Sequence, residues 1–339
     1  MIVDRYYYHQ LNKTEQVIYN VFYKGVMKHQ DVIPLPLRGH PSMQTFEKIF
    51  AAVTRDNPLI YYLNQSACNI VNDSKGHLAI CPQYFFEEKK VKEYNEKIED
   101  TVNTIIHQLQ LLNCNDYEKE KRIHDWICKN ITYDDNGSDI DNWVRVMSSH
   151  NILGVFAYHT AQCEGIAKAV KVLLNAVDVK CIVVMGRATR DAKKIPHAWN
   201  LVNIAGKPYQ LDVTWDLGAS KRVSNMIAYD YFNLTDSDMG IDHISDNQMP
   251  VCKLKEDNYY VKNRIIFRTK YGVFRYVDQM ITLGKTEFTF LLEGRLNNRK
   301  TLQDIDEHIK EKFGNDGGCS RQIQVRGRID KGICWVEIR

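Results

Sequence analysis

Apolar residues recur along the chain with two periods, one typical of helices and one typical of strands, so the sequence predicts an α+β protein. In the N-terminal third, the helical period follows Asn12-Lys13-Thr14-Glu15, which has the spacing of a capped helix start. Runs rich in β-branched and aromatic residues come next and favour strands. The predicted elements here are helices over 13–30, 42–55 and 87–101, and two or three strands within 59–71 and 76–86, separated by a turn at 73–76.

The middle of the chain has the clearest pattern. Asn115-Asp116-Tyr117-Glu118 repeats the capping spacing ahead of a helix that ends before a turn at 135–137. After Cys163, apolar or small residues fall at the spacing of an amphipathic helix over 163–177. Strands are predicted over 180–187, 197–204 and 208–215.

Beyond Pro250 the pattern changes again and predicts a small C-terminal α+β module. Its predicted elements are strands near 259–276 and 286–293, a helix over 301–313, and closing strands over 321–329 and 333–338. The chain of 339 residues exceeds the usual size of a single domain. We therefore expect an N-terminal α+β accessory region (1–105), a catalytic core (106–255) and the C-terminal module (256–339).

A hairpin is predicted around Ala205-Gly206, a turn signal between two of the central strands. If the loop has this even length, residues 204 and 207 pair, and the register places Trp199 opposite Asp212. His197 then projects from the same face two positions along, within reach of a hydrogen bond to that carboxylate. A loop of odd length would put the imidazole and the carboxylate on opposite faces.

Composition and charge exclude several classes of protein. The content of 44% hydrophobic and 26% charged residues is that of an ordinary globular protein. Lys and Arg total 45 against 42 for Asp and Glu, and a net charge of +3 is too weak to imply a nucleic-acid partner. The start of the chain lacks the pattern of a signal peptide, and no run approaches the ~18 apolar residues of a membrane span. We expect a chain with no membrane span.

The nine cysteines are an odd number without CxxC spacing, which favours reduced thiols and a cytoplasmic setting. His124 and Cys128 stand four apart on a predicted helix and could share a metal. Because no second pair completes a zinc set, a non-ligand role is favoured. Cys181 lies in an apolar strand, where a buried, inert thiol is expected.

Three residues in order along the chain meet the needs of thiol catalysis, which are an activated thiol, a base, and a group that orients the base. Cys163 begins the predicted helix, where backbone N–H groups and the helix dipole favour a thiolate. His197 and Asp212 come from the predicted hairpin as base and orienting acid. The backbone N–H of Cys163 is the first candidate donor to an oxyanion. The second donor stays open, with Gln162 and Tyr158 both near in sequence.

These residues also carry a family resemblance. The run GVFAYHTAQCEGIAKAVKVLLNAVDVKCIVVMG, followed by HAWNLVNIAGKPYQLDVTWD, resembles the core of bacterial transglutaminase-like proteins, a superfamily of papain-like fold. KRIHDWICKNITYD upstream resembles the helix that opens this core, and YFNLTDSDM with Asp242-His243 resembles its exit. The positions that match the family pattern are Gly154, Cys163, Glu164, Gly165, His197, Trp199, Asn200, Asp212, Thr214, Trp215 and Asp216.

The resemblance covers about 115–250 and implies a helix bearing the nucleophile packed on an antiparallel sheet. It implies a Cys163-His197-Asp212 triad that serves peptide hydrolysis or glutamine transamidation on a peptide or protein substrate, with no cofactor. Ile166 departs from the family, where Tyr commonly follows Cys-Glu-Gly, and this affects the substrate groove rather than the triad. The acidic loop that binds calcium in animal transglutaminases is missing, so no metal requirement is predicted.

For other residues near the motif, structural roles such as capping and packing are expected. Asp216 competes with Asp212 as the orienting acid but is expected to cap the end of the strand. Trp199 and Trp215 are expected to pack around the site rather than to contact substrate. His150 and His159 flank the nucleophile, and loop histidines rarely have a specific role.

Two other functions compete with amide acyl transfer. Arylamine N-acetyltransferases use a comparable Cys-His-Asp order to move an acyl group from a thioester to an amine. Their Arg-Gly-Gly-x-Cys context is absent here, where Ala161-Gln162-Cys163 stands instead. The other alternative is an inert binding or scaffold module with the same fold, although no triad member is lost. The sequence leaves the substrate and the oligomeric state open.

Overall fold

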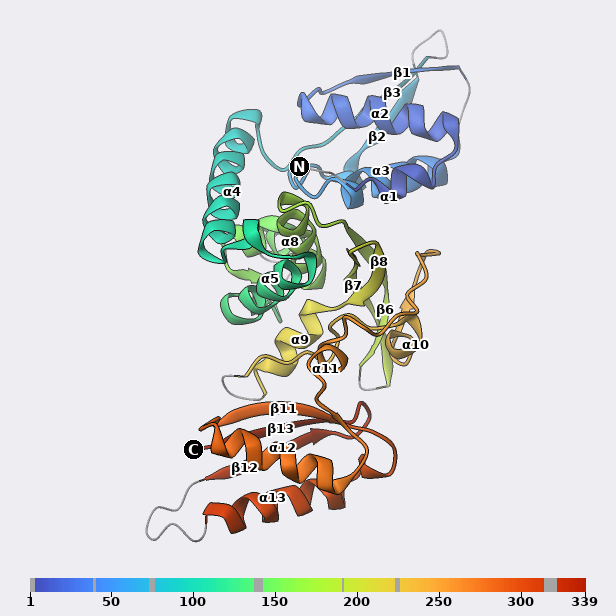
Figure 1. Ribbon diagram of the computed structural model, residues 1–339. Coiled ribbons are helices and arrows are strands. Elements are labelled where there is room, and N and C mark those ends of the chain that lie inside the picture. Colours follow the sequence, from blue (N-terminus) through green and yellow to red (C-terminus); the bar gives the residue numbers. More distant parts are fainter. Residues whose placement is uncertain are drawn as a thin grey trace.

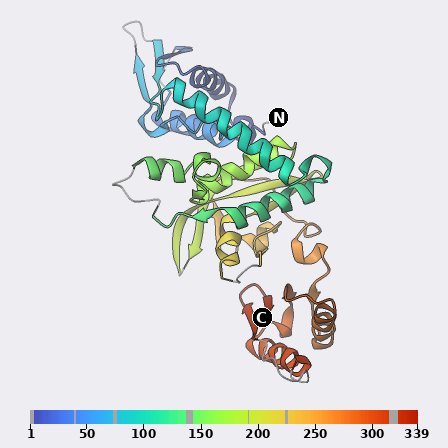
Figure 2. The same ribbon diagram turned by 90° about the vertical axis from the view of Figure 1, so that its left-hand side faces the viewer.

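The computed structural model describes residues 4–38, 41–72, 77–136, 143–190, 192–222, 226–313 and 322–339. The chain forms three consecutive parts that lie in a row. The N-terminal part is at one end and the C-terminal part at the other, with the sheet that carries the candidate site between them (Figure 1 and Figure 2). In the described residues, helices and antiparallel sheets are both present, as the sequence predicts.

The N-terminal part combines helices with a small antiparallel sheet of order β1-β3-β2. The sequence pattern does not predict β1, because Pro34 and Pro36 weaken the strand signal, but prolines are tolerated at a sheet edge, where β1 lies. The elements are α1 (Tyr6–His9), α2 (Lys13–Met27), β1 (Ile33–Arg38), α3 (Met43–Asp56), η1 (Gln65–Ala67), β2 (Asn69–Asn72), β3 (His77–Cys81) and α4 (Glu88–Gln108).

Strand predictions for this part are only partly right. Residues 59–68 form turns and η1, with a single isolated bridge between Leu63 and Tyr84, instead of a strand. The aromatic residues that suggested a strand, Tyr61 and Tyr62, are buried against the helices. The predicted turn at 73–76 lies outside the described residues.

The central part holds a four-stranded antiparallel sheet of order β8-β7-β6-β9, with α8 packed on it. Its elements are η2 (Leu111–Asn113), α5 (Asp116–Asn130), β4 (Thr132–Tyr133), α6 (Trp143–Ser149), α7 (Ile152–Phe156), β5 (Thr160–Ala161), α8 (Cys163–Ala176), β6 (Cys181–Arg190), β7 (Lys193–Ile204), β8 (Lys207–Leu211), α9 (Val213–Ser220), α10 (Asp236–Met239) and β9 (His243–Ser245).

The β7–β8 hairpin has the predicted even loop and register. Ile204 pairs with Lys207 around the two-residue turn Ala205-Gly206, and both turn residues have positive φ, as a type I′ turn requires. The ladder runs to the pair formed by Asn200 and Leu211. The register therefore brings Asp212, which directly follows β8, to the same site as His197 in β7.

The predicted strand over 208–215 is wrong beyond Leu211. Asp212 is the N-cap of α9, and its Oδ1 accepts a hydrogen bond from the backbone N–H of Trp215 at 3.1 Å. An Asp that satisfies a free N–H in this way stabilises a helix start. Asp216 consequently lies inside α9 and does not cap the end of a strand.

Helix α8 is anchored by an apolar face in which Ile166, Val170, Leu173 and Leu174 are fully buried. Burial of each such side chain stabilises the fold by ~1.5–3 kcal/mol relative to exposure. The first turn of the same helix packs on the sheet, where Cys163 adjoins a small buried cluster of Ala167, Val183 and Ala198. The packing thus fixes the position of the thiol relative to β6 and β7.

The C-terminal part is built on a sheet of order β10-β11-β13-β12 and has a hydrophobic core of its own. Of the strands predicted near 259–276, only the short β10 (Ile266–Phe267) forms, and the prediction is wrong for the residues that follow it. Thr269 caps a helix there, and Val273 and Val277, four residues apart, are its buried positions. The elements are α11 (Tyr259–Lys262), β10 (Ile266–Phe267), α12 (Lys270–Thr282), β11 (Glu287–Leu292), η3 (Gly294–Leu296), α13 (Arg299–Phe313), β12 (Ile323–Arg328) and β13 (Ile333–Ile338).

The N-terminal and central parts share one continuous hydrophobic core. Tyr7 in α1 donates a hydrogen bond to the carbonyl of Val183 in β6 at 2.7 Å, and the Nζ of Lys171 in α8 donates to the carbonyl of Asp4 at 2.9 Å. Domain boundaries at 105 and 255 stay predictions. None of the helices in the described ranges combines the length and the apolar character that a membrane crossing needs.

Candidate active site

Cys163 is the first residue of α8, and its side chain is partly buried. The side chain of the N-cap residue, Gln162, makes no capping hydrogen bond, so it leaves the N–H groups of the first turn available to an oxyanion. Because Gly165 has no side chain, the backbone around Ser149 can pack closely against the first turn of α8. A Cβ at position 165 would collide with the carbonyl oxygen of Ser149.

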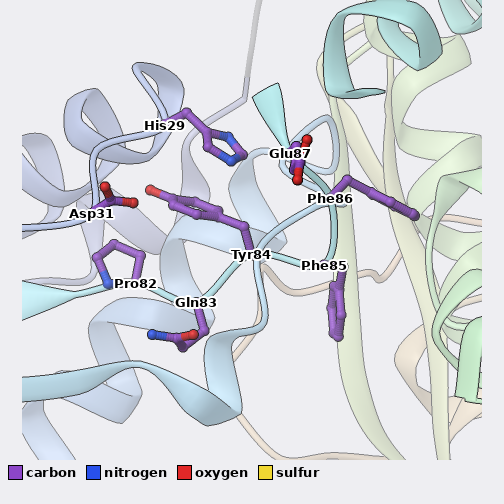
Figure 3. Close-up of a pocket in the computed structure, with 8 residues that line it drawn as sticks. All are labelled: His29, Asp31, Pro82, Gln83, Tyr84, Phe85, Phe86 and Glu87. Carbon is purple, nitrogen blue, oxygen red and sulfur yellow. The ribbon is translucent and has the colours of Figure 1, made fainter. Parts of the chain in front are cut away.

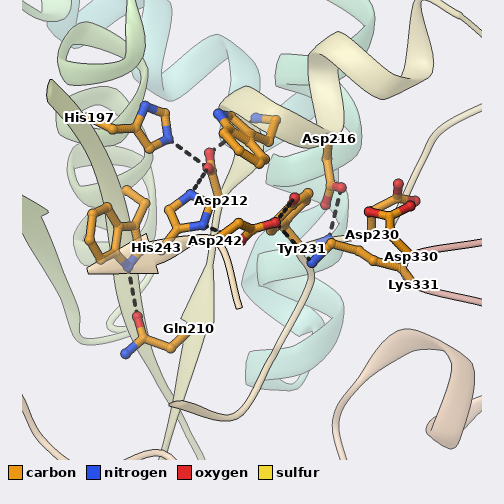
Figure 4. Close-up of polar contacts among 12 residues, drawn as sticks. His197, Gln210, Asp212, Asp216, Asp230, Tyr231, Asp242, His243, Asp330 and Lys331 are labelled. Atoms are coloured by element: carbon orange, nitrogen blue, oxygen red, sulfur yellow. Dashed lines mark hydrogen bonds and ion pairs between the residues drawn. The ribbon is translucent and has the colours of Figure 1, made fainter. Parts of the chain in front are cut away.

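His197 projects from β7 and is 4% exposed. Its Nε2 lies 2.7 Å from Oδ2 of Asp212 (Figure 4). Burial disfavours the protonated ring, but the Asp212 carboxylate outweighs burial and raises the pKa of His197 to about 10. The nearby Cys163 side chain also contributes to this rise, in keeping with the packing of Cys163 beside Ala198, the next residue in β7.

Asp212 is fully buried, and both of its oxygens accept hydrogen bonds. Oδ1 accepts from the N–H of Trp215, and Oδ2 faces Nε2 of His197 and Nε2 of His243. Burial raises the pKa of a carboxyl, but the His197 ring outweighs burial here and holds the pKa of Asp212 far below its usual range. Asp212 is therefore an anion that is fixed on three sides.

Two tryptophans enclose the imidazole. The ring of Trp199 is stacked with that of His197 at a centroid separation of 6.1 Å, and the ring of Trp215 lies at 5.8 Å. Nε1 of Trp199 donates to Oε1 of Gln210 at 2.8 Å, which fixes the indole. The indoles exclude water from the His197–Asp212 pair, and this strengthens the electrostatic attraction within it.

His243, in β9, is a buried member of the site for which the residue spacing gave no signal. It is separated from Asp212 by 31 residues, and only the pairing of β9 with β6 brings it to the carboxylate. Its Nε2 lies 3.1 Å from Oδ2 of Asp212, and its Nδ1 lies 2.6 Å from Oδ1 of Asp242. The neighbouring Asp242-His243 pair was visible in the sequence only as part of the family resemblance.

A metal is the other interpretation of this group, since ligand atoms of His197, Asp212 and His243 lie within 4.8 Å of one another. The two N···O separations, 2.7 and 3.1 Å, are hydrogen-bond lengths. Ligands ~2.0 Å from a tetrahedral zinc would be roughly 3.3 Å apart. The arrangement is better described as two imidazoles bound to one carboxylate.

Asp216, the competing acid, faces away from this group. Its Oδ2 lies 3.1 Å from Nε2 of His124, and its Oδ1 accepts from the N–H of Tyr231. Cys128 lies 3.8 Å from the same His124 nitrogen. These residues form a buried polar network between α5 and α9 that does not include the thiol of Cys163.

The two candidates for the second oxyanion donor have partners elsewhere. Nε2 of Gln162 donates to the carbonyl of Asp134 at 3.1 Å, and the hydroxyl of Tyr158 lies 3.1 Å from that of Tyr94. The second donor stays open.

The other residues considered from the sequence have structural contacts away from the predicted triad. His150 lies 3.6 Å from Glu164, which also pairs with Lys168 at 2.7 Å. His159 has positive φ, and its carbonyl accepts from Thr132. Cys181 is buried, and burial raises the pKa of its thiol to about 12.

Cavities in the described part of the chain include one of about 470 Å³ in the N-terminal part (Figure 3). It is lined by His29, Asp31 and residues 82–87, and the His29 ring stacks on that of Tyr84 at 3.9 Å. A cavity of about 180 Å³ lies between the N-terminal part and the start of α8, where Glu164 and Lys168 line it. Neither cavity is lined by a member of the predicted triad.

Comparison with known proteins bears on the central part. Residues 105–213 match the model of the transglutaminase-like superfamily. Kyphoscoliosis peptidase from Mus musculus is 20% identical over 240 residues, which cover 62% of this chain and 36% of the mouse protein. The chain thus spans about a third of that relative.

Among solved structures, one described as a TGase is 15% identical and has a TM-score of 0.31, with 54% of this chain and 50% of that chain covered. The transglutaminase-like assignment therefore depends on the family match over residues 105–213. That segment contains all three residues of the predicted triad.

Proposed function

We propose that this chain, whose core is transglutaminase-like, is a thiol enzyme that transfers acyl groups from amide bonds of peptides or protein glutamines. Cys163 is the nucleophile, His197 the base and Asp212 the residue that orients the base. The single observation that supports this most strongly is the 2.7 Å contact between His197 and Asp212 beside a thiol at a helix start.

The reaction follows from the charges of these groups. His197 takes the proton of the Cys163 thiol, and the sulfur attacks the amide carbonyl. The oxyanion that forms is stabilised by backbone N–H groups in the first turn of α8. The C–N bond then breaks, the protonated His197 gives its proton to the leaving amine, and an acyl-thioester remains on Cys163.

The second half of the reaction returns the free enzyme. Water or an amine, deprotonated by His197, attacks the thioester and releases the acid or a new amide. Asp212 stabilises the imidazolium in both halves and keeps its Nε2 proton fixed. Hydrolysis and transamidation thus share one set of residues, and the incoming nucleophile decides between them.

A burst of product from an activated ester tests the proposal. Wild-type protein should give a burst equal to the enzyme concentration, and Cys163→Ala and His197→Ala should abolish it. Cys181→Ala is the matched control, since its thiol is buried, and it should keep the burst. Equal release by all four proteins would overturn the proposal.

Mass spectrometry of the trapped adduct separates the acyl donors. An acyl group on Cys163 after incubation with a glutamine peptide supports amide transfer. A stable acetyl group on Cys163 after incubation with acetyl-CoA would indicate a thioester-dependent acyltransferase instead.

A further inference from the structure

His243 lies between two carboxylates that come from different elements. Its Nε2 is 3.1 Å from Oδ2 of Asp212, and its Nδ1 is 2.6 Å from Oδ1 of Asp242 (Figure 4). The side chain of His243 is fully buried, so water cannot replace either contact. An imidazole with carboxylates at both nitrogens makes two hydrogen bonds only when both nitrogens carry protons, that is, as a cation.

The far side of Asp242 favours its ionised form. Oδ2 of Asp242 accepts a hydrogen bond from the hydroxyl of Tyr231 at 2.6 Å and lies 3.6 Å from Nζ of Lys331. The Lys331 side chain is 8% exposed and lies over the Tyr231 ring at 3.8 Å. A buried ammonium beside a carboxylate keeps that carboxylate ionised, so Asp242 cannot supply a proton that would let His243 stay neutral.

Lys331 belongs to the turn between β12 and β13 in the C-terminal part. Arg328, from the same hairpin, donates from Nη1 to the buried Oδ2 of Asp230 at 3.0 Å and approaches the Tyr231 hydroxyl at 3.4 Å. The hairpin thus contacts the central part at Asp230 and Tyr231 and, through Lys331, at Asp242 (Figure 4).

We propose that His243 is a positively charged positioning residue of the active site, held between Asp212 and Asp242, and that the Lys331 hairpin of the C-terminal part completes it. This inference rests on the proposed function of Cys163 and His197. His243 and His197 both contact Oδ2 of Asp212, so His243 helps to hold the carboxylate in place. The positive charge of His243 also repels the imidazolium of His197, and the two ring centroids are 5.3 Å apart.

The charged groups that face His243 set the sign of this effect. They are Asp212 at the N-cap of α9, His197 from β7, Asp242 next to it in the chain, and Tyr231, Lys331 and Arg328 on the far side of Asp242. Because His243 is the nearest cation to the His197–Asp212 pair among these, loss of its charge stabilises the imidazolium of His197. The pH at which His197 loses its proton then rises.

Asp242→Asn tests the charge of His243 while it leaves the imidazole and its Nε2–H donor in place. The curve of Cys163 alkylation rate by iodoacetamide against pH should keep its shape. Its alkaline limb, where His197 loses its proton, should move to higher pH by on the order of one unit. Asp278→Asn is the matched control, because Asp278 forms a similar pair with His308 at 2.8 Å in the C-terminal part. It should move neither limb. An unchanged or lowered limb in Asp242→Asn would overturn the proposal.

His243→Gln removes the charge and keeps an amide that can donate to Asp212. Its alkaline limb should move up by more than that of Asp242→Asn, since the Asp242 charge remains. An unchanged limb in a folded His243→Gln protein would mean that His243 has a packing role only, which also overturns the proposal.

Ring ¹⁵N NMR of the wild-type protein reports the charge of His243 directly and does not depend on activity. The His243 signals, assigned by their absence in His243→Gln, should report two protonated nitrogens at pH 7.5, and one unprotonated nitrogen would overturn the proposal. If Cys163 reacts no faster than an ordinary thiol in the wild type, the proposed function fails, and the NMR result still decides the charge of His243.

Discussion

Gly186 lies directly opposite His197 in the ladder between β6 and β7. A Cβ at position 186 would stand 2.7 Å from Cη2 of Trp199 and would collide with the carbonyl oxygen of Ile244 in β9. The missing side chain therefore makes room for the indole that stacks on His197 and for the strand that carries His243. No larger residue fits without moving one of them.

Gly186→Ala should destabilise the fold by about 1–3 kcal/mol, because the added methyl overpacks a closed site. Urea unfolding measures the change. Gly218→Ala is the control, since nothing lies within 4 Å of a Cβ there and the position is helical. It should be neutral or stabilising by up to about 1 kcal/mol. Equal stability of the two variants would contradict the described packing.

Asp212→Asn should lower kcat by on the order of 10²–10⁴-fold with little change in KM, because the amide cannot stabilise the imidazolium. Asp216→Asn should instead lower the free energy of unfolding, since it disturbs the buried contact with His124, and should leave the pH profile of the activity in place. Steady-state kinetics of both variants with an activated ester distinguish them. A larger kinetic effect in Asp216→Asn would make Asp216 the orienting acid.

The stabilising effect of the His197–Asp212 pair should depend on pH. Because the pKa of His197 rises to about 10 in the folded protein, its contribution is fully present below the unfolded pKa of ~6.5 and is lost as the pH rises toward 10. The difference in unfolding free energy between wild type and His197→Gln should therefore shrink between pH 7 and 10. A difference that stays constant over this range would show that the ring is not charged.

Arg328→Met should destabilise the protein by about 3–5 kcal/mol near pH 8, because it leaves the buried Asp230 carboxylate unpaired. Burial, followed by the Asp216 charge, raises the pKa of Asp230 to about 7, so the cost should fall below pH 6, where the carboxyl is neutral. Arg268→Met is the control. Its pair with Glu293 is exposed and should contribute less than ~1 kcal/mol. Equal losses in the two variants would contradict the role of the hairpin contact.

The parts of the site that could be predicted from sequence are those whose structure depends on residues close together in the chain. The turn Ala205-Gly206 sets the register of the β7–β8 hairpin, and the spacing after Cys163 sets the start of α8. These two elements bring the thiol, the imidazole and the carboxylate to one site. Their catalytic roles stay predictions.

Where prediction failed, a side chain or a distant strand decided the structure. The bond from Asp212 to the N–H of Trp215 turned an expected strand into α9. The apolar and aromatic residues of α12 have β propensity, but the Thr269 cap and the packing of Val273 and Val277 favour the helix. His243 could not be placed by spacing, because only the β6–β9 pairing brings it to Asp212.

The most direct test of the account is the rate of Cys163 alkylation by iodoacetamide at pH 6, compared between wild type and His197→Ala. Peptide mass spectrometry locates the label, and the buried Cys181 is the internal reference. We predict that Cys163 in the wild type reacts about 10²-fold faster than in His197→Ala, because the imidazolium stabilises the thiolate. The same rate in both proteins would contradict a Cys163–His197 pair and, with it, the proposed thiol enzyme.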